Sequence, residues 1–165
     1  MKNIKQILFL LVMTMVAITS SVNAQDKKPE EVKKIVESKN FIFKAQTVIP
    51  QSSSSRILTT DYDLTITGDS VISYLPYFGR AYSAPLDPTK GGIQFTSTKF
   101  EYKQIKDGDE WEITIRPKDA TDVQELYLTI FDNSRATLLV NNTNRQSISF
   151  NGYVKEGKEK EKKAF

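Results

Sequence analysis

FEYKQIKDGDEWEITI, residues 100–115, is the segment from which the architecture of this chain can be inferred. Apolar and polar side chains alternate on both sides of Asp107-Gly108, a pair typical of the type I′ turn of a β-hairpin. If these two residues form the loop, apolar residues face one another on one side of the hairpin and charged residues on the other. The expected pairs are Phe100 with Ile115, Tyr102 with Ile113, and Lys103 with Glu112.

Two more hairpins are indicated on either side of this segment. Gly68-Asp69 is typical of a two-residue turn that pairs Ile66 with Val71. Residues 126–130 and 136–140 keep their apolar faces together only across an odd-numbered loop, which favours 132–134. Asn133 or Ser134 would then adopt a left-handed backbone conformation. Counting from Gly68-Asp69 also predicts the pairs Leu64 with Ser73 and Tyr62 with Leu75.

The alternation with period two extends from Phe41 to about Val154. Gly152 interrupts the final strand and indicates a bulge or a kink. Eight or nine strands joined mostly by hairpins predict an antiparallel, mainly β domain over residues 40–154. An up-and-down β-barrel and a two-sheet sandwich both satisfy this pattern, and the meander of neighbouring strands favours the barrel.

A short helical segment is expected before the β domain, at residues 25–39. Asp26 is suited to cap a helix over 26–39, and Pro29 is suited to its first turn. The spacing of three apolar residues gives one narrow stripe, which predicts that the helix covers an end or an edge of the β domain. These residues are Val32, Ile35 and Val36.

The two ends of the chain have compositions of their own. Lys2 and Lys5, an apolar run over 7–18 and small residues before Gln25 are typical of a signal peptide over 1–24, cleaved before Gln25. The apolar run is shorter than the about 20 residues of a membrane-spanning helix. We therefore expect a periplasmic or secreted protein of a bacterial cell envelope, without a transmembrane segment after cleavage. No Cys follows the run, which excludes a lipoprotein. Residues 155–165 predict a charged, disordered tail.

Composition excludes several kinds of chemistry. The chain of 165 residues contains no Cys and no His. Disulfides, thiolate nucleophiles, imidazole bases and His-ligated metals are therefore excluded. We predict no enzymatic activity, no cofactor and no metal. Asp61 and Asp63 are spaced like the paired carboxylates of glycosidases, but the strand pattern turns both toward solvent. A carboxylate-based hydrolase is accordingly the weakest hypothesis.

Charge gives little indication of a nucleic-acid partner. The full chain has 23 Lys and Arg residues against 20 Asp and Glu. Removal of the predicted signal peptide takes away two lysines and leaves a net charge of +1. Basic and acidic residues alternate through the body instead of forming the positive stripe that binds phosphates. We therefore do not expect the protein to bind nucleic acid.

The segment LPYFGRAYSAP, residues 75–85, is unlike an ordinary short, polar loop. Two prolines and Gly79 favour one fixed backbone shape. Two interpretations remain open: a structural plug over a barrel end, or a binding surface of aromatic and guanidinium groups. Arg145, later in the chain, would extend this surface or pair with a loop carboxylate. The candidate binding residues are Tyr77, Phe78, Arg80, Tyr82 and Arg145.

These blocks carry a resemblance to a family. LPYFGRAYSAP, with Asp61-Tyr62-Asp63-Leu64 before it and residues 92–97 after it, resembles an uncharacterised family of exported domains from Gram-negative bacteria. Residues 111–113 and 144–150 are similar to its later blocks. The resemblance spans about residues 40–154 and implies export and a mainly β fold, but no activity. The family commonly has Gly where this chain has Ser134, which bears on the geometry of that turn only.

Two functions are compatible with these features. The first is an exported, non-enzymatic binding domain that presents residues 76–86 to an unknown protein or glycan partner. The alternative is a carrier of a small, lipid-like ligand in a partly hollow barrel. The interior of such a barrel would be formed by Tyr62, Phe95, Phe100, Tyr102, Trp111, Leu128 and Phe150.

Overall fold

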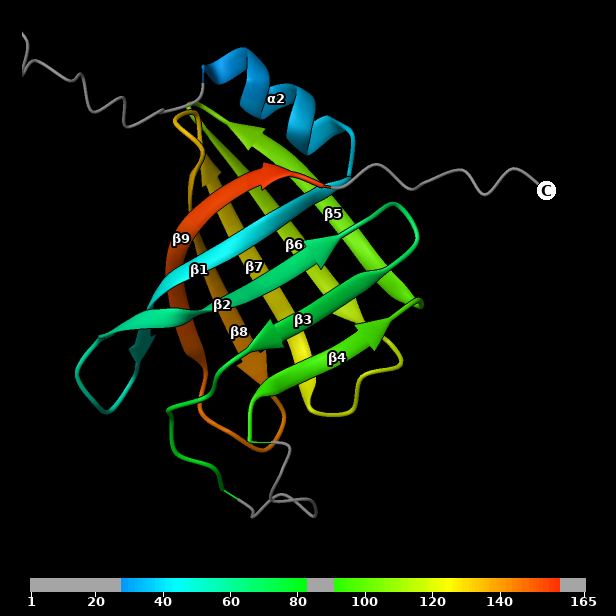
Figure 1. Cartoon of the computed structure of the whole chain (residues 1–165). Helices are drawn as coiled ribbons and strands as arrows, with labels where there is room; N and C mark the ends of the chain where they lie inside the picture. Colours follow the sequence, from blue (N-terminus) through cyan, green and yellow to red (C-terminus); the bar gives the residue numbers. More distant parts are fainter. Residues whose placement is uncertain (1–27, 83–90, 158–165) are drawn as a thin grey trace, which may run out of the picture.

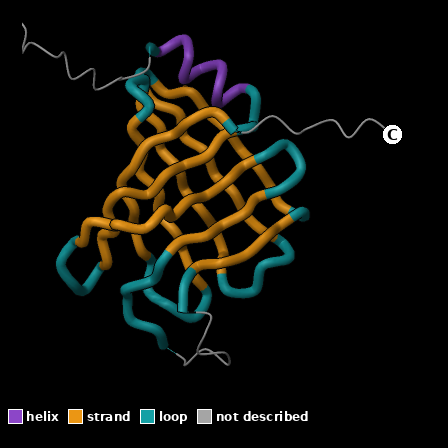
Figure 2. Tube along the Cα trace, viewed as in Figure 1, coloured by secondary structure: helices purple, strands orange, loops and turns teal. Residues whose placement is uncertain are grey.

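The computed structural model describes residues 28–82 and 91–157. These residues form nine antiparallel strands in one nearly closed, barrel-like sheet, with one short helix across one end (Figures 1 and 2). The mainly β fold predicted from the sequence is therefore confirmed. The elements are α2 (Pro29–Glu37), β1 (Phe41–Pro50), β2 (Arg56–Ile66), β3 (Val71–Leu75), β4 (Ile93–Ser97), β5 (Phe100–Asp107), β6 (Glu110–Pro117), β7 (Val123–Phe131), β8 (Arg135–Asn142) and β9 (Ile148–Glu156).

The strand order explains why the sheet curls into a barrel. The order is β4-β3-β2-β1-β9-β8-β7-β6-β5, so the first and last strands of the chain pair with each other. Every other pair consists of strands that follow one another in the sequence. β4 and β5 are also consecutive, yet they form the two edges of the described sheet. The barrel is therefore open only between these two strands.

Two of the three predicted hairpins have the expected register. Ile66 pairs with Val71 across Gly68-Asp69, and this ladder ends one position before the expected Tyr62–Leu75 pair. Ile130 pairs with Ala136 across the three-residue loop 132–134. Ser134 has a φ of 68°, so it is the residue with the left-handed conformation. These turns were predicted correctly because each loop length keeps the apolar faces together.

The register of the hairpin at 100–115 was predicted wrongly, by two residues. The loop consists of Gly108 and Asp109, and Asp107 pairs with Glu110. Gly108 has a φ of 53° at the first loop position, where a type II′ turn places glycine. A slip by two residues leaves every side chain on its expected face, so the alternation could not reveal the error. The pairs observed are Tyr102 with Ile115, Gln104 with Ile113, and Lys103 with Thr114.

The irregularity predicted at Gly152 lies in the partner strand. The pairing of β1 with β9 shifts between Ala45 and Thr47, so Gln46 forms the bulge, while Gly152 stays paired with Ala45. A Cβ atom at Gly152 would overlap the carbonyl oxygen of Lys44. Glycine is therefore required where the two bent strands approach each other.

Both ends of the described chain differ from the predicted boundaries. β9 continues to Glu156, so the first two residues assigned to the charged tail belong to a strand. The helix begins at Pro29 and ends at Glu37, two residues before the expected end. Lys28 precedes it and makes no capping side-chain hydrogen bond within the described residues. Asp26 and the predicted signal peptide lie outside those residues, as does the tail from 158 onward.

Apolar side chains from every strand meet inside the barrel. Val32, Ile35 and Val36 of α2 are buried against one end of this core, as their spacing predicted. The residues expected to form the interior all contribute to it. Trp111, Leu128 and Phe150 are buried, and Tyr62, Phe95, Phe100 and Tyr102 are half-buried against the same cluster. Within the described ranges, no helix is long and apolar enough to span a membrane.

Candidate functional site

The predicted site residues gather at the barrel end opposite α2, where several strand connections meet (Figure 1). Tyr77, Phe78, Arg80 and Tyr82 follow β3, and Arg145 lies between β8 and β9. An isolated antiparallel bridge joins Ala81 to Arg145. The structure thus brings the two predicted segments together, although they are far apart in the sequence.

Backbone hydrogen bonds fix the segment after β3 against the β8–β9 connection. The N–H of Tyr82 donates to the carbonyl of Asn144 at 2.9 Å, and the N–H of Gln146 donates to the carbonyl of Arg80 at 3.0 Å. These bonds continue the pairing of a strand beyond the end of the sheet. The side chains of residues 78–82 therefore project from a backbone with a defined conformation.

Tyr77 holds this segment in place from the side of the core. Its ring is half-buried against the core, and its hydroxyl lies 2.9 Å from the carbonyl oxygen of Arg80 and 3.0 Å from that of Gln146. Burial raises the pKa of Tyr77, while the nearby Arg145 acts in the opposite direction. The phenol therefore stays protonated, and its single O–H is shared between these two carbonyls.

The largely buried side chain of Arg145 links the β8–β9 connection to Tyr77, Gly92 and Asp122. Its side chain is only 10% exposed, and its guanidinium carbon lies 5.2 Å from the centre of the Tyr77 ring. Nη1 donates to the carbonyl of Gly92 at 3.1 Å, and Nη2 lies 3.5 Å from a carboxylate oxygen of Asp122. Of the two roles considered from the sequence, pairing with a loop carboxylate is the one observed.

The remaining predicted residues face outward. Tyr82 is 71% exposed and Phe78 is 40% exposed, and Arg80 is exposed between them in the sequence. The guanidinium carbon of Arg56, at the start of β2, lies 5.1 Å from the centre of the Phe78 ring. Sequence reasoning missed Arg56, because the start of β2 and the segment after β3 come together only when the barrel forms. We call the surface formed by Arg56, Phe78, Arg80 and Tyr82 the end surface.

A small cleft of about 240 Å³ lies beside Arg145. It separates the first residues of β4 from the β6–β7 connection at 119–123. Asp119 and Asp122 provide carboxylates, and Arg145 provides the opposite charge. The side-chain oxygen of Asn142 is buried here without a hydrogen-bond partner in the described part of the chain. The cleft thus carries two carboxylates against one guanidinium.

The carboxylates considered for catalysis belong to an ion-pair cluster on the barrel wall. Lys44 Nζ lies 2.9 Å from Asp63 and 3.7 Å from Asp61. The hydrogen bond that Lys44 Nζ donates to Asp63 is the main reason why the pKa of Lys44 is raised. Both carboxylates therefore lie in a solvent-accessible ion-pair cluster, without the desolvation that a general acid requires. Among residues 28–82 and 91–157, no group of three or more His, Cys, Asp or Glu side chains could hold a metal ion.

Comparison with known proteins gives a family but no activity. A crystal structure of a DUF4251 family protein from Bacteroides eggerthii DSM 20697 is similar to this chain, with a TM-score of 0.60 and 14% sequence identity. The similarity covers 81% of this chain and 90% of that one, and at this identity it supports the fold alone. No curated protein matches the chain. The sequence profile of the domain of unknown function DUF4251 matches residues 23–154, and the chain therefore belongs to that family.

Proposed function

We propose that this chain is an exported, non-enzymatic binding domain that recognises a protein partner through the end surface. The observation that carries this proposal is that aromatic side chains of one short segment have opposite orientations. Tyr77 is directed inward and holds the backbone, whereas Phe78 and Tyr82 project into solvent. Exposed aromatic side chains that are grouped on a fixed backbone are typical of protein-binding surfaces.

The composition of the end surface favours a protein as the partner. Tyrosine and arginine are enriched among the residues that contribute most binding energy in protein interfaces. Arg56 lies over the ring of Phe78, so apolar area and positive charge are presented together. Because the backbone is already ordered, binding immobilises little beyond these side chains, which reduces its entropic cost.

The packing of the barrel interior favours the binding domain over the carrier of a lipid-like ligand. A carrier needs space inside the barrel for an apolar molecule. The interior positions of Phe41, Phe43 and Phe150 are fully buried by neighbouring side chains, so packing around them requires no ligand. We therefore place the outward surface first, and the carrier function stays a prediction from the sequence.

Site-specific photo-crosslinking in the organism that produces the protein tests the proposal. A benzophenone amino acid replaces Tyr82 in one variant and Ile105, which is 43% exposed on β5, in a control variant. We expect a discrete light-dependent adduct from position 82, absent from position 105 and lost when Arg80→Ala is added. Absence of an adduct at position 82, or identical adducts from both positions, would exclude the end surface as the binding site.

A further inference from the structure

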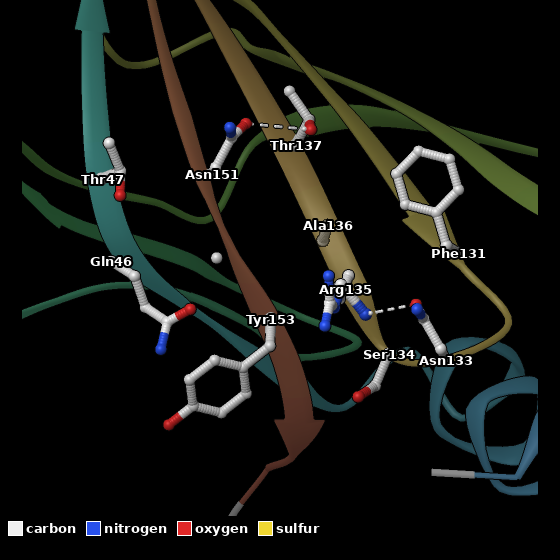
Figure 3. Close-up of a pocket in the computed structure, with 11 residues that line it drawn as sticks. Gln46, Thr47, Phe131, Asn133, Ser134, Arg135, Ala136, Thr137, Asn151 and Tyr153 are labelled. Carbon is white, nitrogen blue, oxygen red and sulfur yellow. Dashed lines mark hydrogen bonds between the residues drawn. The ribbon is translucent and has the colours of Figure 1, made fainter. Parts of the chain in front are cut away.

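A larger hollow, of about 560 Å³, lies on the outer wall of the barrel (Figure 3). It extends across four neighbouring strands, β7, β8, β9 and β1, and reaches the 132–134 turn. None of its lining residues belongs to the end surface. The hollow therefore requires an explanation independent of the proposed function. We call it the wall groove.

The sequence forms this groove at a bend of the sheet. Gln46 is the extra residue of the β1 bulge, and bulges bend the strand that contains them. Beside the bulge, Gly152 of β9 pairs with Ala136 of β8, so the two smallest residues of the lining lie side by side. Figure 1 shows the strong curvature of β9 at this part of the barrel.

Polar groups with unused hydrogen-bonding capacity line the groove. Within the described chain, neither the Gln46 amide nor the Arg135 guanidinium has a hydrogen-bond or ion-pair partner. The side-chain oxygen of Asn133 accepts a bond from the backbone N–H of Arg135 at 3.1 Å. The oxygen of Asn151 accepts one from the hydroxyl of Thr137 at 3.1 Å. Both amide NH₂ groups are thereby oriented while remaining available as donors.

The groove carries one uncompensated positive charge. Among the residues that the structure describes, Arg135 is the only charged one that lines it. The nearest acidic residue in the sequence, Asp132, is bound to Lys106 Nζ at 2.6 Å. Lys44 pairs with Tyr153 across β1 and β9, but its ammonium group is bound to Asp63. Arg135 therefore has no anionic partner among the described residues, and its guanidinium is available to an anionic ligand.

Aromatic side chains accompany this charge. Arg135 and Tyr153 are paired across β8 and β9, and Phe131 ends the neighbouring strand β7. Figure 3 shows Arg135 between the two aromatic residues, with Gln46 and Asn151 on the other sides of the groove. Both rings are exposed. A row of this kind offers apolar faces on either side of a cation.

We propose that the wall groove binds an oligosaccharide that carries a carboxylate. The rings of Tyr153 and Phe131 would stack on the C–H faces of sugar rings, and the amides of Gln46, Asn133 and Asn151 would pair with hydroxyl groups. The planar guanidinium of Arg135 suits a carboxylate, with which it can form two parallel hydrogen bonds. Neutral amides around a single cation fit such a ligand better than a phosphate-rich one.

Binding to a panel of purified oligosaccharides, measured on an array and by calorimetry with the full chain, tests this inference. The panel contains uronic-acid and sialic-acid oligosaccharides, together with counterparts whose carboxylates are reduced to alcohols. We expect binding of an acidic member, and about tenfold or greater weakening on carboxylate reduction or on Arg135→Ala, as for a lost charged hydrogen bond. Arg135→Lys should weaken binding less, because it keeps the charge but loses the planar fork.

Arg80→Ala is the matched control, because it removes an exposed arginine at the opposite end of the barrel. It should leave saccharide binding unchanged, whereas it should abolish the crosslink at position 82. The two proposals can therefore fail separately. The inference is overturned if no acidic member binds, if the reduced counterparts bind equally well, or if Arg80→Ala and Arg135→Ala weaken binding equally. Equal thermal midpoints of the two variants would show that both are folded.

Discussion

The guanidinium group of Arg145 lies over the ring of Tyr77, 5.2 Å from its centre, and joins two connections at one end of the barrel. The Arg145 side chain is largely buried, and the Tyr77 ring packs against the core. Backbone pairing and the side chains of Tyr77 and Arg145 therefore fix the segment after β3. Phe78 and Tyr82 project from this fixed backbone. This arrangement makes distinct predictions for inward and outward residues.

Arg145→Ala should reduce the free energy of unfolding by about 2 kcal/mol, because it removes a partly buried cation–π contact and a charged hydrogen bond to the Gly92 carbonyl. Urea denaturation measures this loss. Arg80→Ala is the control, and should change the free energy by no more than about 0.5 kcal/mol, as for an exposed side chain. Equal losses of free energy from the two variants would show that the contacts of Arg145 do not stabilise the barrel.

Gly152→Ala should destabilise the barrel by about 3 kcal/mol or prevent folding, because the new Cβ overlaps the Lys44 carbonyl oxygen and must separate β1 from β9. Gly68→Ala provides the comparison, since a Cβ at that position would have no atom within 4 Å apart from its own residue and its two chain neighbours. Circular dichroism and thermal unfolding distinguish the two variants. A stable Gly152→Ala protein would contradict the close approach of these strands.

Stability should decrease at alkaline pH partly because of Tyr102. Burial raises the pKa of Tyr102 well above its ordinary value, whereas the unfolded chain ionises near pH 10. Above that pH the unfolded state binds fewer protons than the native state, so the free energy of unfolding falls as pH rises. Tyr102→Phe should flatten this decrease. The raised pKa of Lys44 acts in the same direction, so the slope should become smaller without reaching zero.

Urea denaturation of both proteins at pH 9, 10 and 11 measures the two slopes. Identical slopes would mean that the phenol of Tyr102 ionises as readily in the folded protein as in the unfolded chain.

Asp119 should make the corner between β4 and β5 sensitive to acid. Its carboxylate accepts hydrogen bonds from the hydroxyl of Ser97 and from the N–H groups of Thr98 and Lys99, and the Ser97 bond is the main cause of the lowered pKa of Asp119. A lowered pKa contributes stability above the unfolded value of about 3.9, and this contribution is lost as pH falls through the folded value.

Asp119→Asn should therefore lower the thermal midpoint at pH 7 and lower it less at pH 2, because the contribution of the carboxylate decreases as the pH falls below the unfolded value. Differential scanning calorimetry at both values provides the comparison. The interpretation fails if the difference between the two proteins is the same at pH 2 and pH 7.

Local sequence patterns predicted the strands better than their exact registers. The 132–134 loop was predicted correctly because its odd length was the only one that kept apolar residues 126–130 and 136–140 on one face. The loop near Gly108 was misplaced because a shift by two residues preserves the faces, so only the backbone of the turn decides. The bulge at Gln46 could not be read locally, because it depends on pairing between the first and last strands.

The candidate site was predicted as residues but not as an arrangement. Proline and aromatic content identified the segment after β3, yet the inward position of Tyr77 follows from its bond to the Gln146 carbonyl, far along the chain. The roles of Arg145 remained open for the same reason. The wall groove was missed altogether, because Tyr153 and Phe131 occupy ordinary outward positions of strands, and only the bend beside Gly152 groups them.

The yield of the adduct from position 82 in two further backgrounds shows whether the outward aromatic groups bind the partner. Phe78→Ala should reduce the yield about tenfold, since an aromatic residue at an interface can contribute about 2 kcal/mol to binding. The thermal midpoint should change little, because an exposed side chain contributes less to folding than a core residue does. Tyr77→Phe should lower the midpoint, because the hydroxyl bonds to the Arg80 and Gln146 carbonyls are lost, while the outward groups that meet the partner remain. An adduct yield that is unaffected by Phe78→Ala, or that merely follows the thermal midpoint in both backgrounds, would contradict the account.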